Sequence, residues 1–279
     1  AAAFAEQPLA ARATVSAYSY LTDGVVTTVF DLVSRHLHPC PNPTEGERLA
    51  LLAVGGYGRA EMAPFSDVDL LFLTPWKMTA WAETVIESTL YVLWDLHLKV
   101  GHSSRTAKDC LRIGREDLSV RTALLEHRFL AGHRPLAAEL RTRLRNDLFA
   151  GTGPEFVEAK LAERAERHLK HGNHRYVVEP NVKEGKGGLR DLQTLFWIEK
   201  YLSGVRDVSE LVKRGVFTKT EFDAFVEAEN FLLAVRCHMH LAAGRAVDQL
   251  TFDFQIEVAE RMGFADRGGR RGVEHFMQT

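Results

Sequence analysis

Residues 49–73, LALLAVGGYGRAEMAPFSDVDLLFL, contain an apolar run that ends in Gly55-Gly56 and a second apolar run that carries Asp67 and Asp69. Side chains alternate between the two faces of a strand, so Asp67 and Asp69 are expected to project together. Two carboxylates on one face repel each other unless a cation lies between them. Mg²⁺ is the expected cation, because it takes oxygen ligands and commonly shares them with substrate phosphates. Glycines lack a Cβ, so the backbone at Gly55 and Gly56 can approach a phosphate and direct N–H groups at it.

Each of these features has a simpler interpretation when it is taken alone. A Gly-Gly pair after a strand is commonly only a tight turn, and an Asp near a strand end often caps a loop. Here the two features occur in order, about ten residues apart, in the pattern apolar-Gly-Gly followed by Asp-apolar-Asp-apolar. This pattern is typical of nucleotidyltransferases, and it places Val68, Leu70 and Phe72 on the opposite side of the strand, towards a core.

Enzymes of this kind normally use a third carboxylate on a later strand. Asp95 and Glu126 are the candidates in this sequence. Asp95 can equally end a helix, and Glu126 can equally be a residue at the edge of the core that is paired with Arg128. Lys99 occupies a position where an acid would be expected. The third ligand therefore stays open.

A second informative stretch is 178–197, VEPNVKEGKGGLRDLQTLFW, in which a glycine-rich loop leads into a helix that begins near Leu189. Lys183, Lys186 and Arg190 gather at this helix start, where the helix dipole favours anions rather than cations. An anion is therefore expected to accompany them, and the start of a helix is itself suited to phosphate. The alternatives are a solvated basic turn, or a loop that Asp191 and Gln193 tie to a neighbouring domain.

Composition sets limits on the class of protein. The chain has 279 residues, 46% hydrophobic and 26% charged, which is ordinary for a globular protein. A net charge of −2 gives no electrostatic reason to expect nucleic-acid binding. The three cysteines are scattered and include no C-x-x-C, so we expect neither a disulfide framework nor a zinc site. No apolar run reaches the ~18 residues of a membrane span, and we expect a cytoplasmic protein without membrane association.

Helical spacing of apolar residues predicts several helices. One follows an N-cap at Thr22-Asp23, and others cover residues 78–96, 119–130, 135–148 and 154–169. A short strand is expected over residues 98–106. His168, His171 and His174 recur every three residues, but Gly172 interrupts the helix there, and a solvated helix end is expected rather than a metal site.

The two stretches together, GGYGRAEMAPFSDVDLLFL and VEPNVKEGKGGLRDLQTLFWI, resemble the bacterial PII uridylyltransferase/uridylyl-removing enzymes, which act in nitrogen regulation. The segment GHSSRT and residues 117–132 resemble the same family, so the likeness covers nearly the whole chain. The first stretch is shared with other nucleotidyltransferases, including the glutamine synthetase adenylyltransferase, whereas the second is more specific. The resemblance implies an α+β fold, with a polymerase-β-like nucleotidyltransferase domain over residues 1–132 and a helical domain over residues 133–279.

The resemblance also implies transfer of UMP from UTP to a tyrosine of the PII protein, with Mg²⁺. It assigns the phosphate-loop glycines to Gly55 and Gly56 and the catalytic, metal-binding aspartates to Asp67 and Asp69. The nucleotide-binding candidates are completed by residues beside the metal site or at the second stretch, namely Arg59, Ser66, Lys183 and Arg190. For Arg59, a surface salt bridge is an equally simple interpretation.

Full-length members of the family also carry a His-Asp-type hydrolase domain and glutamine-sensing ACT domains. This sequence contains no His-Asp dipeptide, begins without Met and stops at Thr279, so we expect a piece of a longer protein that adds UMP without removing it or sensing glutamine. Two other functions remain open: a protein adenylyltransferase, and a non-catalytic nucleotide-binding module that regulates a partner.

Overall fold

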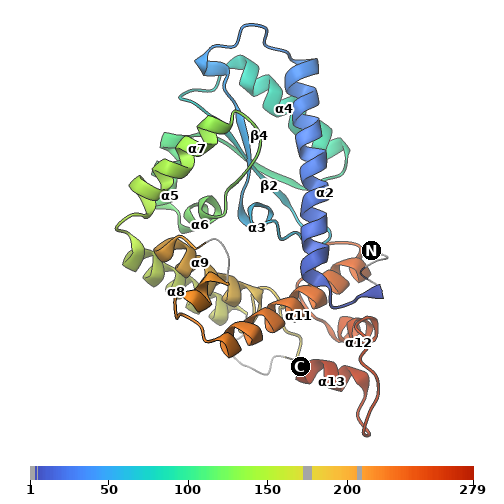
Figure 1. Ribbon diagram of the computed structural model, residues 1–279. Helices are drawn as coiled ribbons and strands as arrows, with labels where there is room; N and C mark the ends of the chain where they lie inside the picture. Colours follow the sequence, from blue (N-terminus) through green and yellow to red (C-terminus); the bar gives the residue numbers. More distant parts are fainter. Residues whose placement is uncertain (1–3, 5, 172–177, 206–208) are drawn as a thin grey trace. The chain divides into compact units, whose positions relative to one another are not determined.

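The computed structural model describes residue 4 and residues 6–171, 178–205 and 209–279 (Figure 1). The chain divides into two compact units. The sheet unit comprises Ser16–Met62 and Ser66–Pro154, and the helical unit comprises Ala1–Val15, Ala63–Phe65 and Glu155–Thr279. The predicted α+β class, with a small mixed sheet followed by helices, is confirmed.

A four-stranded sheet in the order β3-β2-β1-β4 forms the centre of the sheet unit. Its strands are β1 (Ala50–Ala53), β2 (Val68–Thr74), β3 (Val100–Thr106) and β4 (Arg128–Gly132). β1 pairs antiparallel with both β2 and β4, whereas β2 and β3 are parallel. A parallel pair requires a crossover, which helix α4 (Ala80–Asp95) supplies between β2 and β3. The strand predicted over residues 98–106 and the helix predicted over residues 78–96 are thus confirmed as β3 and α4.

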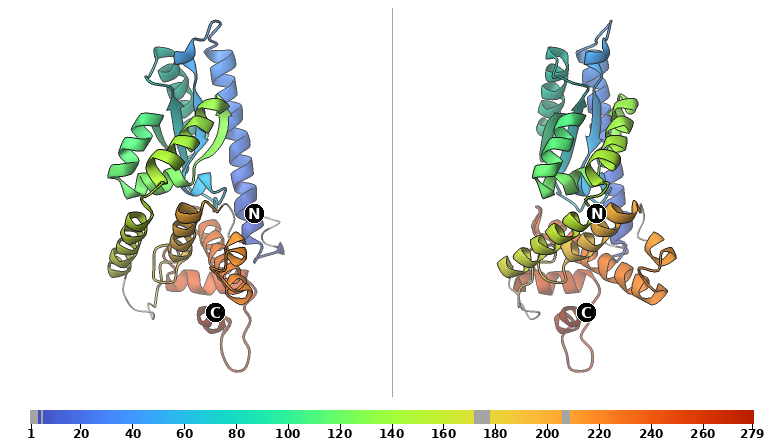
Figure 2. Two further views of the ribbon diagram at one scale, coloured as in Figure 1. Left: turned by 60° about the vertical axis from the view of Figure 1, so that its left-hand side comes forward. Right: turned by 90° about the vertical axis from the view of Figure 1, so that its left-hand side faces the viewer.

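Both faces of the sheet are covered by helices, as Figure 2 shows for the sheet unit. Leu70 and Phe72 pack on one face with apolar side chains of α2 (Ala11–Leu32), the π-helical turn η1 (Val33–Leu37) and α4. Leu71 and Leu73 pack on the other face with α5 (Ala107–Glu116), α6 (Leu118–Leu125), α7 (Arg134–Arg143) and the π-helical turn η3 (Leu144–Phe149). The predicted direction of Val68, Leu70 and Phe72 towards a core is therefore confirmed.

Two local predictions in this unit are wrong. Helix α2 runs straight through Thr22 and Asp23, so these residues do not form an N-cap. The Thr22 hydroxyl instead donates to the Tyr18 carbonyl inside the helix. The helix predicted over residues 119–130 ends at Leu125, and β4 follows, because residues 128–132 pair with β1.

Within the described residues, six further helices make up most of the helical unit. They are α8 (Gly153–Lys170), α9 (Leu189–Ser203), α10 (Glu210–Lys213), α11 (Lys219–Ala243), α12 (Phe252–Arg261) and α13 (Gly272–Gln278). Their shared core joins Val182 and Leu189 of the glycine-rich stretch to the middle of α11, and it also includes Ala11, Val15 and Ala63. Among the residues described, no helix is both long enough and apolar enough to cross a membrane.

The predicted boundary between residues 132 and 133 stays a prediction. In the structure, residues 133–154 pack with the sheet unit rather than with the helical unit. The reason is that Leu140 and Leu144, on α7 and η3, are fully buried against one face of the sheet.

Candidate active site

Asp69 is the second residue of β2, and Asp67 precedes the strand by one residue. Asp69 is partly buried, whereas Asp67 is exposed and Ser66 is partly buried. Leu71 and Leu73 pack into the core on one face of the sheet, and because side chains alternate along a strand, Asp69 lies on the same face. Asp67 is on that side if the chain continues extended from β2, and the shared face of the two carboxylates stays a prediction.

Two glycines from neighbouring segments flank the Asp69 carboxylate. Gly55 follows the end of β1 after one residue, Val54, and has a φ of +59°, a conformation that glycine adopts without strain. A Cβ at Gly55 would lie 3.4 Å from Asp69 Oδ2, and a Cβ at Gly101 would lie 2.6 Å from Asp69 Oδ1. The fold thus brings Gly55 and Asp69 together, as predicted for a phosphate loop beside a metal carboxylate. Gly101 lies in β3, where it pairs with Asp69.

Gly55-Gly56 opens a single helical turn, α3 (Gly55–Gly58), between β1 and β2. A Cβ at Gly58 would lie 2.0 Å from the Glu126 carbonyl oxygen and 3.1 Å from that of Ala53, so only glycine fits there. The role of this third glycine could not be predicted from the sequence, because no residue close to it in the chain indicates that residue 126 is near. This close packing fixes the position of the turn relative to the Ala53 and Glu126 backbone.

Arg59 follows the turn and forms an ion pair with Glu61, with Nε 2.9 Å from Oε2. The Arg59 side chain is only 9% exposed, so this contact is no ordinary surface salt bridge. Its guanidinium also lies near Gly56, because a Cβ there would be 3.8 Å from Nη2. A contact between Arg59 and a triphosphate stays a prediction.

The structure leaves the third carboxylate open. Glu126 is buried at the C-terminal end of α6, whereas Asp95 is exposed at the last position of α4. Arg128 does not pair with Glu126 as one interpretation had it, but with Asp23. β3 contains no acid, and Gly101 stands in it directly beside Asp69.

The residues present fit a divalent cation of the magnesium type. Gly55 and Gly101 leave space at the Asp69 carboxylate that a β-carbon would fill. Within the described ranges, no group of three or more His, Cys, Asp or Glu side chains is arranged to hold a metal ion. Mg²⁺ is commonly bound through one or two carboxylates, with waters and substrate phosphates completing its shell. Asp67 and Asp69 stay the predicted protein ligands of such a cation.

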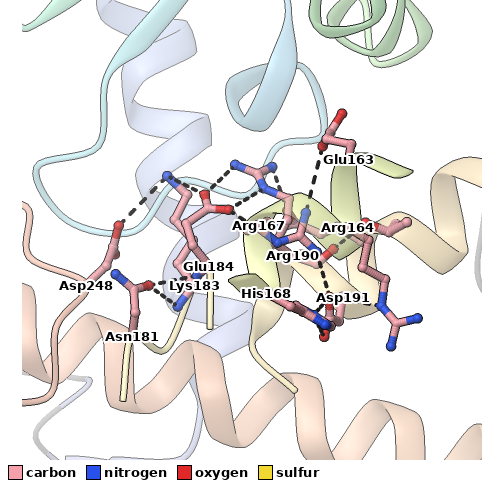
Figure 3. Close-up of polar contacts among 12 residues, drawn as sticks. Glu163, Arg164, Arg167, His168, Asn181, Lys183, Glu184, Arg190, Asp191 and Asp248 are labelled. Atoms are coloured by element: carbon pink, nitrogen blue, oxygen red, sulfur yellow. Dashed lines mark hydrogen bonds and ion pairs between the residues drawn. The ribbon is translucent and has the colours of Figure 1, made fainter. Parts of the chain in front are cut away.

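Lys183 and Arg190 belong to the helical unit, where both make ion pairs with the chain's own carboxylates. Arg190 contacts Glu184 with Nη2 3.0 Å and Nε 3.3 Å from its two oxygens. Lys183 Nζ lies 3.8 Å from Glu184 Oε1 and 3.8 Å from Asp248 Oδ2. Figure 3 draws these contacts. Burial, followed by the charge of Arg236, lowers the pKa of Lys183. The anion expected at this helix start is thus supplied by the protein, and nucleotide binding by Lys183 and Arg190 stays a prediction.

Asp191 joins the start of α9 to the end of α8. Its carboxylate lies 2.6 Å from Arg167 Nη2 and 2.9 Å from His168 Nε2, and it accepts the Gly187 N–H at 2.9 Å (Figure 3). His168 is buried, so the prediction of a solvated helix end is wrong for it, and His174 lies outside the described residues. The partner of His168 is 23 residues away in the sequence, beyond the reach of local spacing.

Known proteins resemble this chain in sequence over nearly its whole length. Residues 155–279 match the sequence family described as GlnD PII-uridylyltransferase. The chain is 68% identical over 275 residues to a bifunctional uridylyltransferase/uridylyl-removing enzyme of Cereibacter sphaeroides, which covers 99% of this chain and 30% of that protein. The proteins of the same description from Ruegeria pomeroyi and Azospirillum brasilense are 66% and 56% identical, over 99% and 93% of this chain.

The chain spans about 30% of the length of these relatives. The match nevertheless covers 99% of this chain and so extends over both units. Over 99% of its length the chain is therefore similar to a segment of bifunctional uridylyltransferase/uridylyl-removing enzymes, and its residues 155–279 match the family described as GlnD PII-uridylyltransferase.

Proposed function

We propose that this chain is a Mg²⁺-dependent nucleotidyltransferase that transfers UMP from UTP to a tyrosine of the PII signal-transduction protein. The observation that carries the proposal is the position of the Asp69 carboxylate, which lies between Gly55 and Gly101 beside the Gly55–Gly58 turn. The chain that holds this arrangement is 68% identical to a uridylyltransferase/uridylyl-removing enzyme. A carboxylate that only ended a strand would not need glycines on two sides of it.

In this mechanism the chain's residues act chiefly by positioning. The N–H groups at Gly55 and Gly56 orient the β- and γ-phosphates. Ser66 and Arg59 are further proposed contacts of the nucleotide. Asp67 and Asp69 hold Mg²⁺, which supplies neutralisation of charge on the triphosphate. Lys183 and Arg190 are the proposed nucleotide contacts from the helical unit. A site of this kind accelerates transfer by alignment and electrostatics rather than by covalent chemistry.

The bonds that change follow from the substrates. The acceptor tyrosine oxygen attacks the α-phosphorus opposite the leaving group, and a new phenolic O–P bond forms. The bond between the α-phosphorus and the bridging oxygen breaks, and pyrophosphate leaves with its electron pair. The phenol proton passes to solvent, since no third carboxylate is assigned. A phenol, with an ordinary pKa of about 10, needs less help in losing this proton than a sugar hydroxyl does.

The test is to incubate the protein with Mg²⁺, PII protein and each of the four α-labelled nucleoside triphosphates. We expect label on PII from UTP, with an equal amount of pyrophosphate released. Label from ATP alone would instead support a protein adenylyltransferase. Binding of UTP without pyrophosphate release, with acceptor and Mg²⁺ present, would support a non-catalytic regulatory module.

A further inference from the structure

The side chain of Arg128 binds the far end of the glycine turn. Arg128 is the first residue of β4 and pairs with Ala53, the last residue of β1, so it stands where β1 passes into α3. Its Nη2 donates to the Tyr57 carbonyl at 3.1 Å, and its Nε donates to the Gly58 carbonyl at 3.3 Å. Carbonyls at a helix end favour a cation, and the Tyr57 carbonyl also accepts the Ala60 N–H at 3.1 Å. The guanidinium therefore closes the turn that Gly55 opens.

Asp23, from the middle of α2, holds this guanidinium in place. Its Oδ2 and Oδ1 accept from Arg128 Nη1 at 2.6 Å and from Nη2 at 3.0 Å, which is a bidentate arrangement. The Arg128 guanidinium carbon also lies 5.5 Å from the centre of the Tyr57 ring, which is 1% exposed. The Arg128 and Asp23 side chains are 31% and 26% exposed, so the contact is partly removed from water.

These contacts use the shape of the guanidinium, not only its charge. Three of its nitrogens donate in different directions, to one carboxylate and to two backbone carbonyls. A lysine ammonium is a point charge without this planar fork, and it cannot make the same set of bonds. An ion pair that only joined α2 to β4 would not require the two carbonyl contacts.

We propose that Arg128, oriented by Asp23, is a positioning residue that holds the Gly55–Gly58 turn in the form that binds the triphosphate. The proposal rests on the function proposed above. A glycine-rich turn has large conformational freedom, which is lost when a ligand orders it. Fixing the turn beforehand removes this cost from nucleotide binding. Arg128 itself need not touch the nucleotide.

The test compares steady-state kinetics and melting temperature for Arg128→Lys, Asp23→Asn and the wild-type chain. We expect Arg128→Lys to raise the KM for UTP by about tenfold and to change kcat by less than about threefold, because uniform binding is lost. Asp23→Asn keeps the bonds from Arg128 to the Tyr57 and Gly58 carbonyls but weakens the bidentate contact that orients the guanidinium. It should raise the KM for UTP by roughly two- to fivefold. The matched control is Arg112→Lys, which alters an exposed ion pair with Glu116 on α5 and should leave KM unchanged.

An unchanged KM in folded Arg128→Lys, with only the melting temperature lowered, would overturn the proposal and leave a structural ion pair. If Arg128→Lys does not fold, Asp23→Asn decides in the same way: a raised KM supports the proposal and an unchanged KM overturns it. Failure of the proposed function is distinguishable, because the wild-type chain itself would then transfer no UMP in this assay.

Discussion

Gly101 determines how much space the Asp69 carboxylate has, because it is the residue of β3 that pairs with Asp69. Its φ lies outside the left-handed region, so the backbone there would accept alanine. The obstacle is the Asp69 carboxylate, whose Oδ1 would lie 2.6 Å from an alanine methyl group. A contact that short forces the flexible side chain to move, and the side chain that moves is the proposed metal ligand.

Gly101→Ala is therefore expected to lower UMP transfer by at least about tenfold, while unfolding stability changes by less than ~1 kcal/mol. The measurements are initial rates across a Mg²⁺ titration and urea unfolding. Gly24→Ala is the control, because this helical glycine has open space around it and should gain roughly 0.5–1 kcal/mol with full activity. Normal rates in Gly101→Ala would show that the Asp69 carboxylate need not occupy the position described here.

The aspartates and the first glycines could be predicted from the sequence, since strand alternation and the spacing of a turn are local properties. Gly101 and Gly58 could not be assigned these roles. Gly101 depends on the parallel register between β2 and β3, and Gly58 depends on the approach of the Glu126 carbonyl. Each of these contacts joins segments that are distant in the sequence.

At the scale of elements, two errors have one physical cause. The sequence TALLEHRFL has apolar residues at helical spacing, but residues 128–132 form β4 because β1 offers an unpaired edge. Thr22-Asp23 precedes an apolar run as an N-cap would, but Asp23 is bound by Arg128 within a continuous helix. Tertiary partners overrode local preference in both places. Long periodic segments such as α4 and α8 were predicted correctly, because burial of one face and local propensity agree there.

The α8–α9 junction predicts a dependence of stability on pH. Burial by itself would raise the pKa of Asp191, but the Gly187 N–H, Arg167 and His168 outweigh it and hold that pKa below its ordinary value. A lowered pKa in the folded state stabilises the protein above the unfolded value of about 3.9, and this stabilisation is lost as the pH falls further towards the folded value.

Asp191→Asn should therefore reduce unfolding stability by about 2–4 kcal/mol at pH 7, because it removes a charge that Arg167 and His168 share. Urea unfolding between pH 7 and pH 3 should show the gap to wild type narrowing below about pH 4. Glu158→Gln, an exposed change on α8, should alter stability by less than ~0.5 kcal/mol throughout. A gap that stays constant with pH would contradict this role for the Asp191 charge.

At the scale of the whole molecule, the two compact units are interwoven along the chain. Ala63–Phe65, between the glycine turn and Asp67, belongs to the helical unit. Ala63 is buried in the helical core, and the Pro64 carbonyl is hydrogen-bonded by Nδ1 of His240, a fully buried residue of α11. α2 likewise contributes Val15 to one core and Val26 to the other. A sequence-based boundary, drawn as a single cut, cannot represent this arrangement.

The paired aspartates carry the proposed activity of the molecule, and Asp69→Asn tests them most directly. A neutral amide keeps the size of the side chain but holds Mg²⁺ poorly, so we expect UMP transfer from UTP to PII to fall by at least ~10²-fold with an unchanged melting temperature. Asp253→Asn, the same change at an exposed position of α12, should retain full transfer in the same assay. Substantial transfer by a correctly folded Asp69→Asn protein would contradict the site proposed here.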